Sequence, residues 1–327
     1  MARLGTSLLV AFTLFSSAGT IHPALAADEC SHLKGFWLDL ISTDEGYLVP
    51  VSVAGTPRLF LLATSSGYAK LDEKVVEELK LPTKAAPEGF SVVASKVRLT
   101  RIATSPTIQL GPVTRPDAEF LISPHNDRWG PRADGEAGMN IFGGFDIELD
   151  LAHNKVGLFL PRDCKFVPYW KYDVFGNSSF VIEPTGIMLL PMTLDGKRIE
   201  ASISTAHEKS YMGLTVARML LGIEEKSSSY TPADKTPWGK DTFRYPFKTL
   251  TGGDNVTINN PEIYVNVDEG VVCGGIAGRR IAELNDYSHY CYSGGDVELG
   301  RKELRQLRMF FVFKEKRVYF TLAEPRS

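Results

Sequence analysis

The chain has 327 residues and a formal net charge of −3 at pH 7, from 36 Lys and Arg against 39 Asp and Glu. The basic residues are scattered along the chain, which argues against a nucleic-acid-binding surface. Because the chain is longer than a single hydrophobic core usually serves, we expect two compact units.

The N-terminal residues 1–26 have the pattern of a secretory signal peptide. They carry one basic residue, Arg3, then an apolar stretch over residues 8–15, and then Ala-Leu-Ala at residues 24–26. Small residues at alternate positions are what signal peptidase requires. The sequence therefore predicts an exported protein, periplasmic or secreted. No later segment approaches the roughly 20 apolar residues of a spanning helix, so no membrane anchor is expected.

A β-hairpin is the first element predicted after the leader. Residues 46–53 and 58–62 are apolar segments, and the Ala-Gly-Thr-Pro run at residues 54–57 between them has turn chemistry. The triplet Ala63-Thr64-Ser65 follows the second strand directly.

A short helix and several strands are predicted next. Asp72 can cap a helix in which Val75, Val76 and Leu79 share one face. Strand-like segments follow at residues 92–93, 96–101, 107–110 and 117–122.

A Gly- and Pro-rich stretch, residues 124–138, precedes the end of the first half. Two roles fit the run around Trp129, a binding loop and an ordinary exposed loop, and we expect the second. The half then closes with Phe142-Gly143 and a hairpin over residues 145–160.

The second half repeats the first. Residues 187–222 align with residues 46–81 without a gap, each partner lying 141 positions further on. Matching residues include Leu48 and Leu189, Pro50 and Pro191, Gly55 and Gly196, Thr64 and Thr205, Val75 and Val216, and Leu79 and Leu220. Further on, residues 256–265 align with 113–122, Leu299-Gly300 with Phe142-Gly143, and residues 309–320 form the closing hairpin. We therefore expect an N-terminal lobe at residues 27–165, a connection at 166–187 and a C-terminal lobe at 188–327.

Four cysteines in an exported chain allow three pairings, which the sequence does not distinguish. We prefer Cys30 with Cys164, which would hold the N-terminal segment against the first lobe, and Cys273 with Cys291, which would close a local loop. A metal site is not expected, because there is no C-x-x-C pair and no closely spaced His. No cofactor is expected either.

The strand, triplet and helix pattern resembles that of the two-lobed aspartic proteases of the pepsin and retropepsin type, particularly exported bacterial proteins with two retropepsin-like units. The resemblance covers roughly residues 45–162 and 187–322. It implies an all-β fold with a few short helices and two homologous lobes around a cleft. In that family each lobe supplies Asp-Thr-Gly or Asp-Ser-Gly after an apolar strand, with an apolar-apolar-Gly element behind it.

Both catalytic aspartates of the family are missing here. The first triplet is Ala63-Thr64-Ser65 and the second is Ser204-Thr205-Ala206. Family chemistry needs two neighbouring carboxylates that share a proton and activate a water. The alanine side chain has no group that takes up or releases a proton. A serine hydroxyl does not act as a general base at neutral pH unless a neighbouring group accepts its proton. We therefore expect no aspartic-protease catalysis.

Other residues near the triplets are candidates to replace the missing aspartates. Asp72 and Glu208 are the nearest downstream acids, and His207, which follows the second triplet, could suggest nucleophilic catalysis together with Ser204 or Ser66. No Gly-x-Ser-x-Gly motif accompanies the serines, so we interpret Ser66 and His207 as cleft-lining residues.

The resemblance implies that Gly143 and Gly300 lie behind the two triplets. The function predicted is that of a pseudoprotease that binds or regulates a polypeptide in the cleft, since backbone and side-chain recognition survives loss of the catalytic groups. An active hydrolase with unusual cleft residues and a structural envelope protein remain as alternatives. The sequence does not indicate an oligomeric state.

Overall fold

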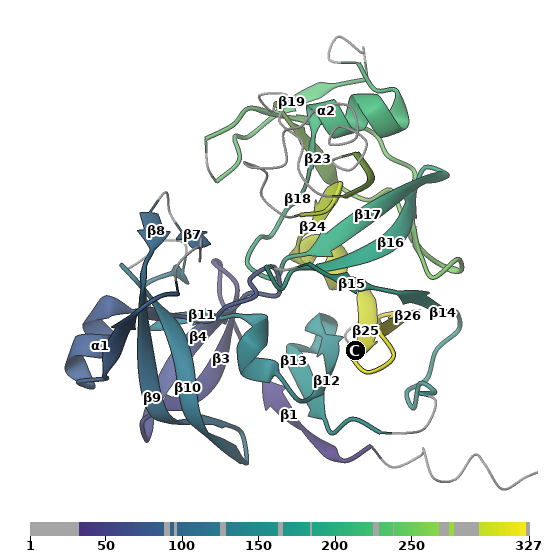
Figure 1. Ribbon diagram of the computed structural model, residues 1–327. Coiled ribbons are helices and arrows are strands. Elements are labelled where there is room, and N and C mark those ends of the chain that lie inside the picture. The colour runs from purple at the N-terminus through teal and green to yellow at the C-terminus, as the bar shows by residue number, and fades with distance from the viewer. Residues whose placement is uncertain are drawn as a thin grey trace, which may run out of the picture.

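The computed structural model describes residues 33–87, 92–94, 97–124, 129–162, 166–183, 185–224, 229–237, 239–267, 275–277 and 294–324. Within these ranges the strands form three large sheets and one small hairpin sheet. Figure 1 shows the strands of the first half on one side and those of the second half on the other, with a third group of strands below the junction. The described residues contain no helix that is long and apolar enough to cross a membrane.

The first half folds into an eight-stranded sheet, and helix α1 (Glu73–Glu78) lies at its outer side (Figure 1). Its strands are β2 (Ile41–Ser42), β3 (Tyr47–Val53), β4 (Thr56–Leu62), β5 (Lys70–Asp72), β6 (Thr83–Ala85), β9 (Arg101–Leu110), β10 (Val113–Ser123) and β11 (Gly135–Ala137). A further pairing of β3 with β9 closes the sheet on itself. Asp72 caps α1 by accepting a hydrogen bond from the Lys74 backbone N–H at 2.9 Å, as predicted. Strands β7 (Val92–Ala94) and β8 (Val97–Leu99) form the small hairpin sheet.

The second half folds in the same way. Its sheet contains β15 (Val181–Ile182), β16 (Met188–Leu194), β17 (Lys197–Ile203), β18 (Ser210–Gly213), β19 (Thr231–Ala233), β20 (Thr242–Arg244), β21 (Thr249–Gly252), β22 (Val256–Asn259), β23 (Ile263–Asn266) and β24 (Val297–Leu299). The helical elements are α2 (Leu214–Val216), the π-helical turn η4 (Ala217–Leu221) and α4 (Arg301–Leu304).

The gap-free repeat is confirmed by the strand bounds. β3 and β4 recur as β16 and β17 with the same limits shifted by 141 positions. Even the hairpin turns match, because Ala54 and Gly55 have φ values of 49° and 80°, and Asp195 and Gly196 have 47° and 76°. Two successive positive φ values give the turn whose twist suits a two-residue hairpin.

A six-stranded sheet joins the two halves. It runs in the order β1-β13-β12-β25-β26-β14. The bounds are β1 (Gly35–Asp39), β12 (Asp146–Asp150), β13 (Lys155–Phe159), β14 (Phe175–Ser179), β25 (Leu307–Val312) and β26 (Arg317–Leu322). The hairpins predicted at the end of each half are present and meet where β12 pairs with β25. The connection between the lobes is largely ordered, since it supplies β14 and β15.

The two faces of this joining sheet have different surroundings. Alternate residues such as Leu158, Phe311 and Phe320 belong to the large core that both lobes share. Their neighbours Phe159, Phe310 and Tyr319 form a second cluster with Phe166 on the other face. The 3₁₀ helix η3 (Leu151–His153) turns the first hairpin, with Asn154 left-handed at its end. The sheet thus fixes the lobes so that the ends of β4 and β17 meet.

Candidate functional site

The two triplets meet at the junction of the lobes through their threonines. Thr64 Oγ1 donates to the Ile203 carbonyl at 3.0 Å, and Thr205 Oγ1 donates to the Leu62 carbonyl at 2.6 Å. Each hydroxyl also accepts from the backbone N–H of the opposite threonine, at 3.1 and 3.2 Å. Both side chains are buried. Four reciprocal hydrogen bonds therefore hold the loops in one relative position.

The serines of the triplets also meet across the junction. Ser65 Oγ and Ser204 Oγ lie 3.1 Å apart, close enough to share a hydrogen bond. Ser204 and Ala63 are buried, whereas Ser65 is partly exposed. The positions of Ala63 and Ser204 are equivalent, because the Ala63 N–H donates to the Ala137 carbonyl and the Ser204 N–H to the Leu299 carbonyl.

This arrangement limits the chemistry of the junction. The paired hydroxyls are neutral at ordinary pH, and neither triplet contains a carboxylate. General acid–base catalysis, which contributes roughly 10²- to 10⁴-fold, needs a group that takes up and releases a proton. The hydroxyl pair can donate and accept hydrogen bonds, as a peptide backbone requires. Neither triplet provides a base that would take up a proton from these hydroxyls.

A polar network lies behind the first triplet. Lys70 Nζ donates to Ser66 Oγ at 2.9 Å and forms an ion pair with Glu136. Glu136 also accepts from Trp129 Nε1 at 3.2 Å. Ser66 donates to the Tyr68 carbonyl at 2.9 Å. Because the Ser66 proton faces a weakly basic carbonyl and Lys70 faces a carboxylate, this network does not activate Ser66 as a nucleophile.

An equivalent network lies behind the second triplet. Glu298 occupies the place of Glu136, since each is the middle residue of its strand and pairs with β17 or β4 in the same way. His207 Nε2 lies 3.6 Å from Glu298 Oε1. Burial, followed by the charge of Glu298, raises the pKa of Tyr211 to about 12, so this phenol stays protonated at neutral pH. Both lobes thus place one carboxylate beside their triplet.

The acids nearest in sequence to the triplets are used elsewhere. Asp72 caps α1, and Glu208 forms ion pairs with Arg301, at 3.0 Å, and with Arg305. Neither is positioned by these contacts to replace a catalytic aspartate.

Arg301 is a cross-lobe contact that the sequence reasoning missed. Its guanidinium is buried and donates to the carbonyls of Glu45 at 2.6 Å, Asp44 at 2.9 Å and Thr205 at 3.2 Å. It therefore connects the segment before β3 with the second triplet. The sequence feature that could have indicated this contact is the basic residue directly after the Leu299-Gly300 pair.

The expected equivalence of Gly143 with Gly300 is wrong. Gly138 is the counterpart of Gly300, because each follows the strand that pairs parallel to the triplet strand. A Cβ on Gly138 would lie 2.3 Å from the Tyr68 backbone, and one on Gly300 would lie 2.4 Å from the Lys209 carbonyl oxygen. Gly143 is exposed at the end of the 3₁₀ helix η2 (Met139–Phe142).

This correction predicts effects of different size for two glycine substitutions. Gly138→Ala should lower the free energy of unfolding by about 1–3 kcal/mol, since the new methyl group meets backbone that cannot move aside. Gly143→Ala should change it by less than about 1 kcal/mol, because φ is −52° there and the nearest atom is 3.2 Å from the Cβ. Urea unfolding of both variants measures the difference. Equal losses would contradict the assignment of Gly138.

Trp129 also departs from expectation. Its side chain is 1% exposed and packs with Leu48, Leu61 and Ala133. Trp129 itself is therefore not part of an exposed loop, whereas Pro131 and Arg132 are exposed and residues 125–128 lie outside the described residues. The large apolar ring within a polar run was the signal that could have indicated burial.

The four cysteines, residues 30, 164, 273 and 291, lie outside the described residues, as does the predicted signal peptide. The preferred disulfide pairing therefore stays a prediction. In the described ranges, no three His, Cys, Asp or Glu side chains come together as a metal site would require.

Comparisons with known proteins agree with this architecture. Residues 49–143, from β3 to the residue that follows η2, match the family described as aspartyl protease. The structure is similar to the crystal structure of the aspartic proteinase from Irpex lacteus, with a TM-score of 0.53 and 12% sequence identity over 89% of this chain and 98% of that one. A search of curated proteins finds no match. At this identity the likeness shows the fold alone. The chain has the aspartic-proteinase fold, mostly β, with two lobes.

Proposed function

We propose that this protein is a catalytically inactive relative of the aspartic proteases, which binds or regulates a polypeptide between its lobes in the periplasm or the extracellular space. The observation that carries the proposal is the state of the two triplets. Ala63 and Ser204 stand where the fold's enzymes have aspartates, while the Thr64 and Thr205 hydrogen bonds that align the loops are intact. A fold that keeps the two triplet loops aligned but lacks the two aspartates is suited to binding a ligand without cleaving it.

The chemistry of the junction supports a polypeptide ligand. The Ser65 and Ser204 hydroxyls offer a donor and an acceptor without charge, which matches backbone N–H and carbonyl groups. Each lobe adds a carboxylate, Glu136 or Glu298, within the networks beside the triplets. The export part of the proposal rests on the signal-peptide pattern of residues 1–26.

One observation favours a second candidate, a hydrolase with unusual residues. His207 lies beside the Glu298 carboxylate, which is how a catalytic base is often oriented. In that case Ser204 would be the nucleophile and His207 the base.

Peptide-library profiling by mass spectrometry, from about pH 3 to pH 8, separates the two candidates. We expect the mature protein to leave the library uncleaved, because no proton-transferring pair occupies the triplets. A Ser204→Ala, His207→Ala double variant is the matched control. Cleavage by the wild type that disappears in this variant would overturn the proposal and establish the hydrolase.

Binding is measured on the same library by recovering the retained peptides. We expect Ser65→Trp to abolish retention, since the bulky ring would fill the junction, and Ser179→Trp, an exposed site on β14, to preserve it. Thermal unfolding checks that both variants are folded. The absence of wild-type retention at millimolar peptide would favour a purely structural role.

A further inference from the structure

A pocket lies on the face of the joining sheet that is turned away from the shared core. Its volume is about 750 Å³, within the roughly 300–1,000 Å³ of typical ligand pockets. Its described lining residues come from the connection after β13, the edge strand β14, the turn between β25 and β26, and β26 itself. Tyr319 and Phe166, which line it, belong to the outer cluster of this face. The pocket is therefore separate from the triplets.

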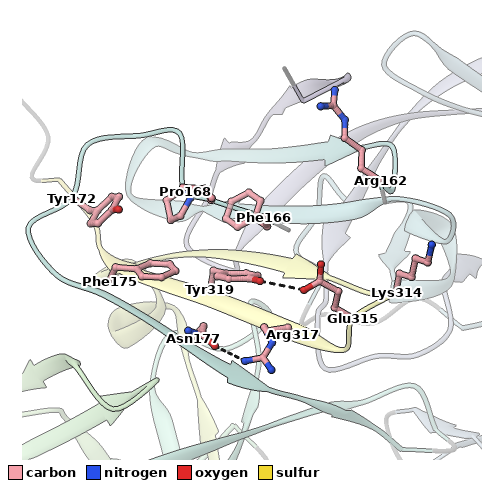
Figure 2. Close-up of a pocket in the computed structure, with 11 residues that line it drawn as sticks. Arg162, Phe166, Pro168, Tyr172, Phe175, Asn177, Lys314, Glu315, Arg317 and Tyr319 are labelled. Atoms are coloured by element: carbon pink, nitrogen blue, oxygen red, sulfur yellow. Dashed lines mark hydrogen bonds between the residues drawn. The ribbon is translucent and has the colours of Figure 1, made fainter. Parts of the chain in front are cut away.

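Aromatic side chains form one end of the pocket. Phe166 and Tyr319 have ring centroids 4.7 Å apart, Tyr319 and Phe175 stack at 5.8 Å with an angle of 14°, and Phe175 and Tyr172 are 5.6 Å apart. Tyr172 is 41% exposed and the neighbouring Val167 is 63% exposed. Figure 2 shows the rings of Tyr172, Phe175, Phe166 and Tyr319 side by side toward this end. An apolar side chain laid on these rings would be removed from water.

Charged side chains form the other end. Figure 2 shows Lys314, Glu315 and Arg162 there, beyond the rings. With Arg317, the described residues of the lining include three cations and one carboxylate. Glu315 already accepts a hydrogen bond from the Tyr319 hydroxyl at 3.2 Å. The charge at this end therefore complements an anionic group.

We propose that this pocket binds an acidic peptide segment, which lays an aromatic side chain on the rings and directs carboxylates toward Lys314 and Arg317. The two ends of the pocket complement two different chemical groups, an apolar ring and a negatively charged group. A small anion satisfies only the charged end, whereas a peptide supplies both from neighbouring residues. An aromatic anchor within a charged rim is also the usual composition of a peptide-binding hot spot.

Fluorescence anisotropy with a short labelled peptide tests the proposal on the mature protein. The peptide carries one Trp flanked by Asp and Glu residues, and two companion peptides have Ala in place of Trp or Lys in place of the acids. We expect the first peptide to bind and both companions to bind at least about tenfold more weakly. Added salt should weaken binding of the first peptide, because rim charges are screened.

Variants of residues that line the pocket test whether the peptide binds there. Lys314→Glu with Arg317→Glu, and separately Tyr172→Ala, should each weaken binding by about tenfold or more. Lys197→Glu, at an exposed position in the β16–β17 hairpin, makes the same kind of charge change elsewhere and should have no effect. Thermal unfolding shows whether each variant is folded, and two independent variants keep the test valid if one is not.

The proposal is overturned if the wild type shows no binding at millimolar peptide, or if it binds the acidic and the basic peptide equally. Unchanged binding in both pocket variants would place the peptide elsewhere, including between the lobes, and would also overturn it. Binding of phosphatidylglycerol vesicles that is lost in the Lys314 and Arg317 variant, without peptide binding, would identify a membrane surface instead.

Discussion

Thr64→Val should lower the free energy of unfolding by about 2–4 kcal/mol, because it removes a hydroxyl from the buried junction without changing the side-chain shape. Thr64 Oγ1 donates to the Ile203 carbonyl and accepts from the Thr205 N–H. Both backbone groups would remain buried without a partner, and each such group costs about 1–3 kcal/mol. For a chain of this length the melting temperature should fall by roughly 3–6 °C, measured by scanning calorimetry.

Three further variants test whether the loss of stability comes from the missing hydroxyl. Thr64→Ser keeps the hydroxyl and should retain most of the stability. Thr114→Val, at an exposed position of β10, should change the free energy by less than about 0.5 kcal/mol. Thr64→Val with Thr205→Val removes all four bonds, and because the two hydroxyls belong to one network its cost should differ from the sum of the single variants. A Thr64→Val protein as stable as the wild type would mean that the reciprocal bonds do not hold the lobes together.

The repeat could be predicted from the sequence because it consists of strand, turn and helix signals among neighbouring residues. Strand, turn and helix signals recur at one fixed spacing, so the equivalence of Thr64 and Thr205 needed no knowledge of long-range contacts. The Asp72 cap and the two closing hairpins are local features of the same kind. Such features follow from neighbouring residues alone.

The spacing changes later in the chain, and there the sequence reasoning failed. Ala137 and Leu299, which accept equivalent hydrogen bonds, are 162 positions apart, compared with 141 for the triplets. The second half has more residues between these two elements, so a fixed spacing does not apply there, and the sequence pattern selects Gly143 in place of Gly138. A short apolar-Gly pattern occurs more than once in this region, so only the strand pairing distinguishes the two.

The side-chain networks were not predictable from residue types. Lys70 and Glu136 are 66 positions apart and meet because β5 pairs with β11. Glu148 and Arg308 are 160 positions apart and meet only through the pairing of the two halves. A charged residue inside an apolar strand indicates a buried partner, and the identity of that partner is a property of the fold.

Arg308→Met should cause the largest loss of stability, about 3–5 kcal/mol at pH 8, because it leaves a buried carboxylate without its cation. Glu148 is 0% exposed and accepts from Arg308 Nε at 2.6 Å. Arg308 also lies 3.7 Å from Asp150 Oδ2, and its guanidinium is 4.4 Å from the centre of the Trp170 ring. Tyr169 donates a hydrogen bond to the other oxygen of Glu148.

The loss should depend on pH in a defined direction. Burial raises the pKa of Glu148 to about 7 from an ordinary value of 4.5, although Arg308 and Tyr169 act in the opposite direction. The folded protein therefore takes up this proton more readily than the unfolded chain. The contribution of Glu148 to stability is most favourable below its ordinary pKa and declines as the pH rises through about 7. Without Arg308 the pKa rises further, so Arg308→Met should be least harmful in acid.

Urea unfolding of Arg308→Met at about pH 5 and pH 8, with Glu148→Gln in the same background, tests this account. We expect the destabilisation to be smaller at the lower pH, and Glu148→Gln to restore much of the stability at the higher pH because it removes the unpaired charge. A loss that is independent of both pH and Glu148→Gln would assign the role of Arg308 to packing against Trp170. Since β12 belongs to the first half and β25 to the second, the expected result would make this ion pair, together with the threonine bonds, a determinant of how the lobes are held.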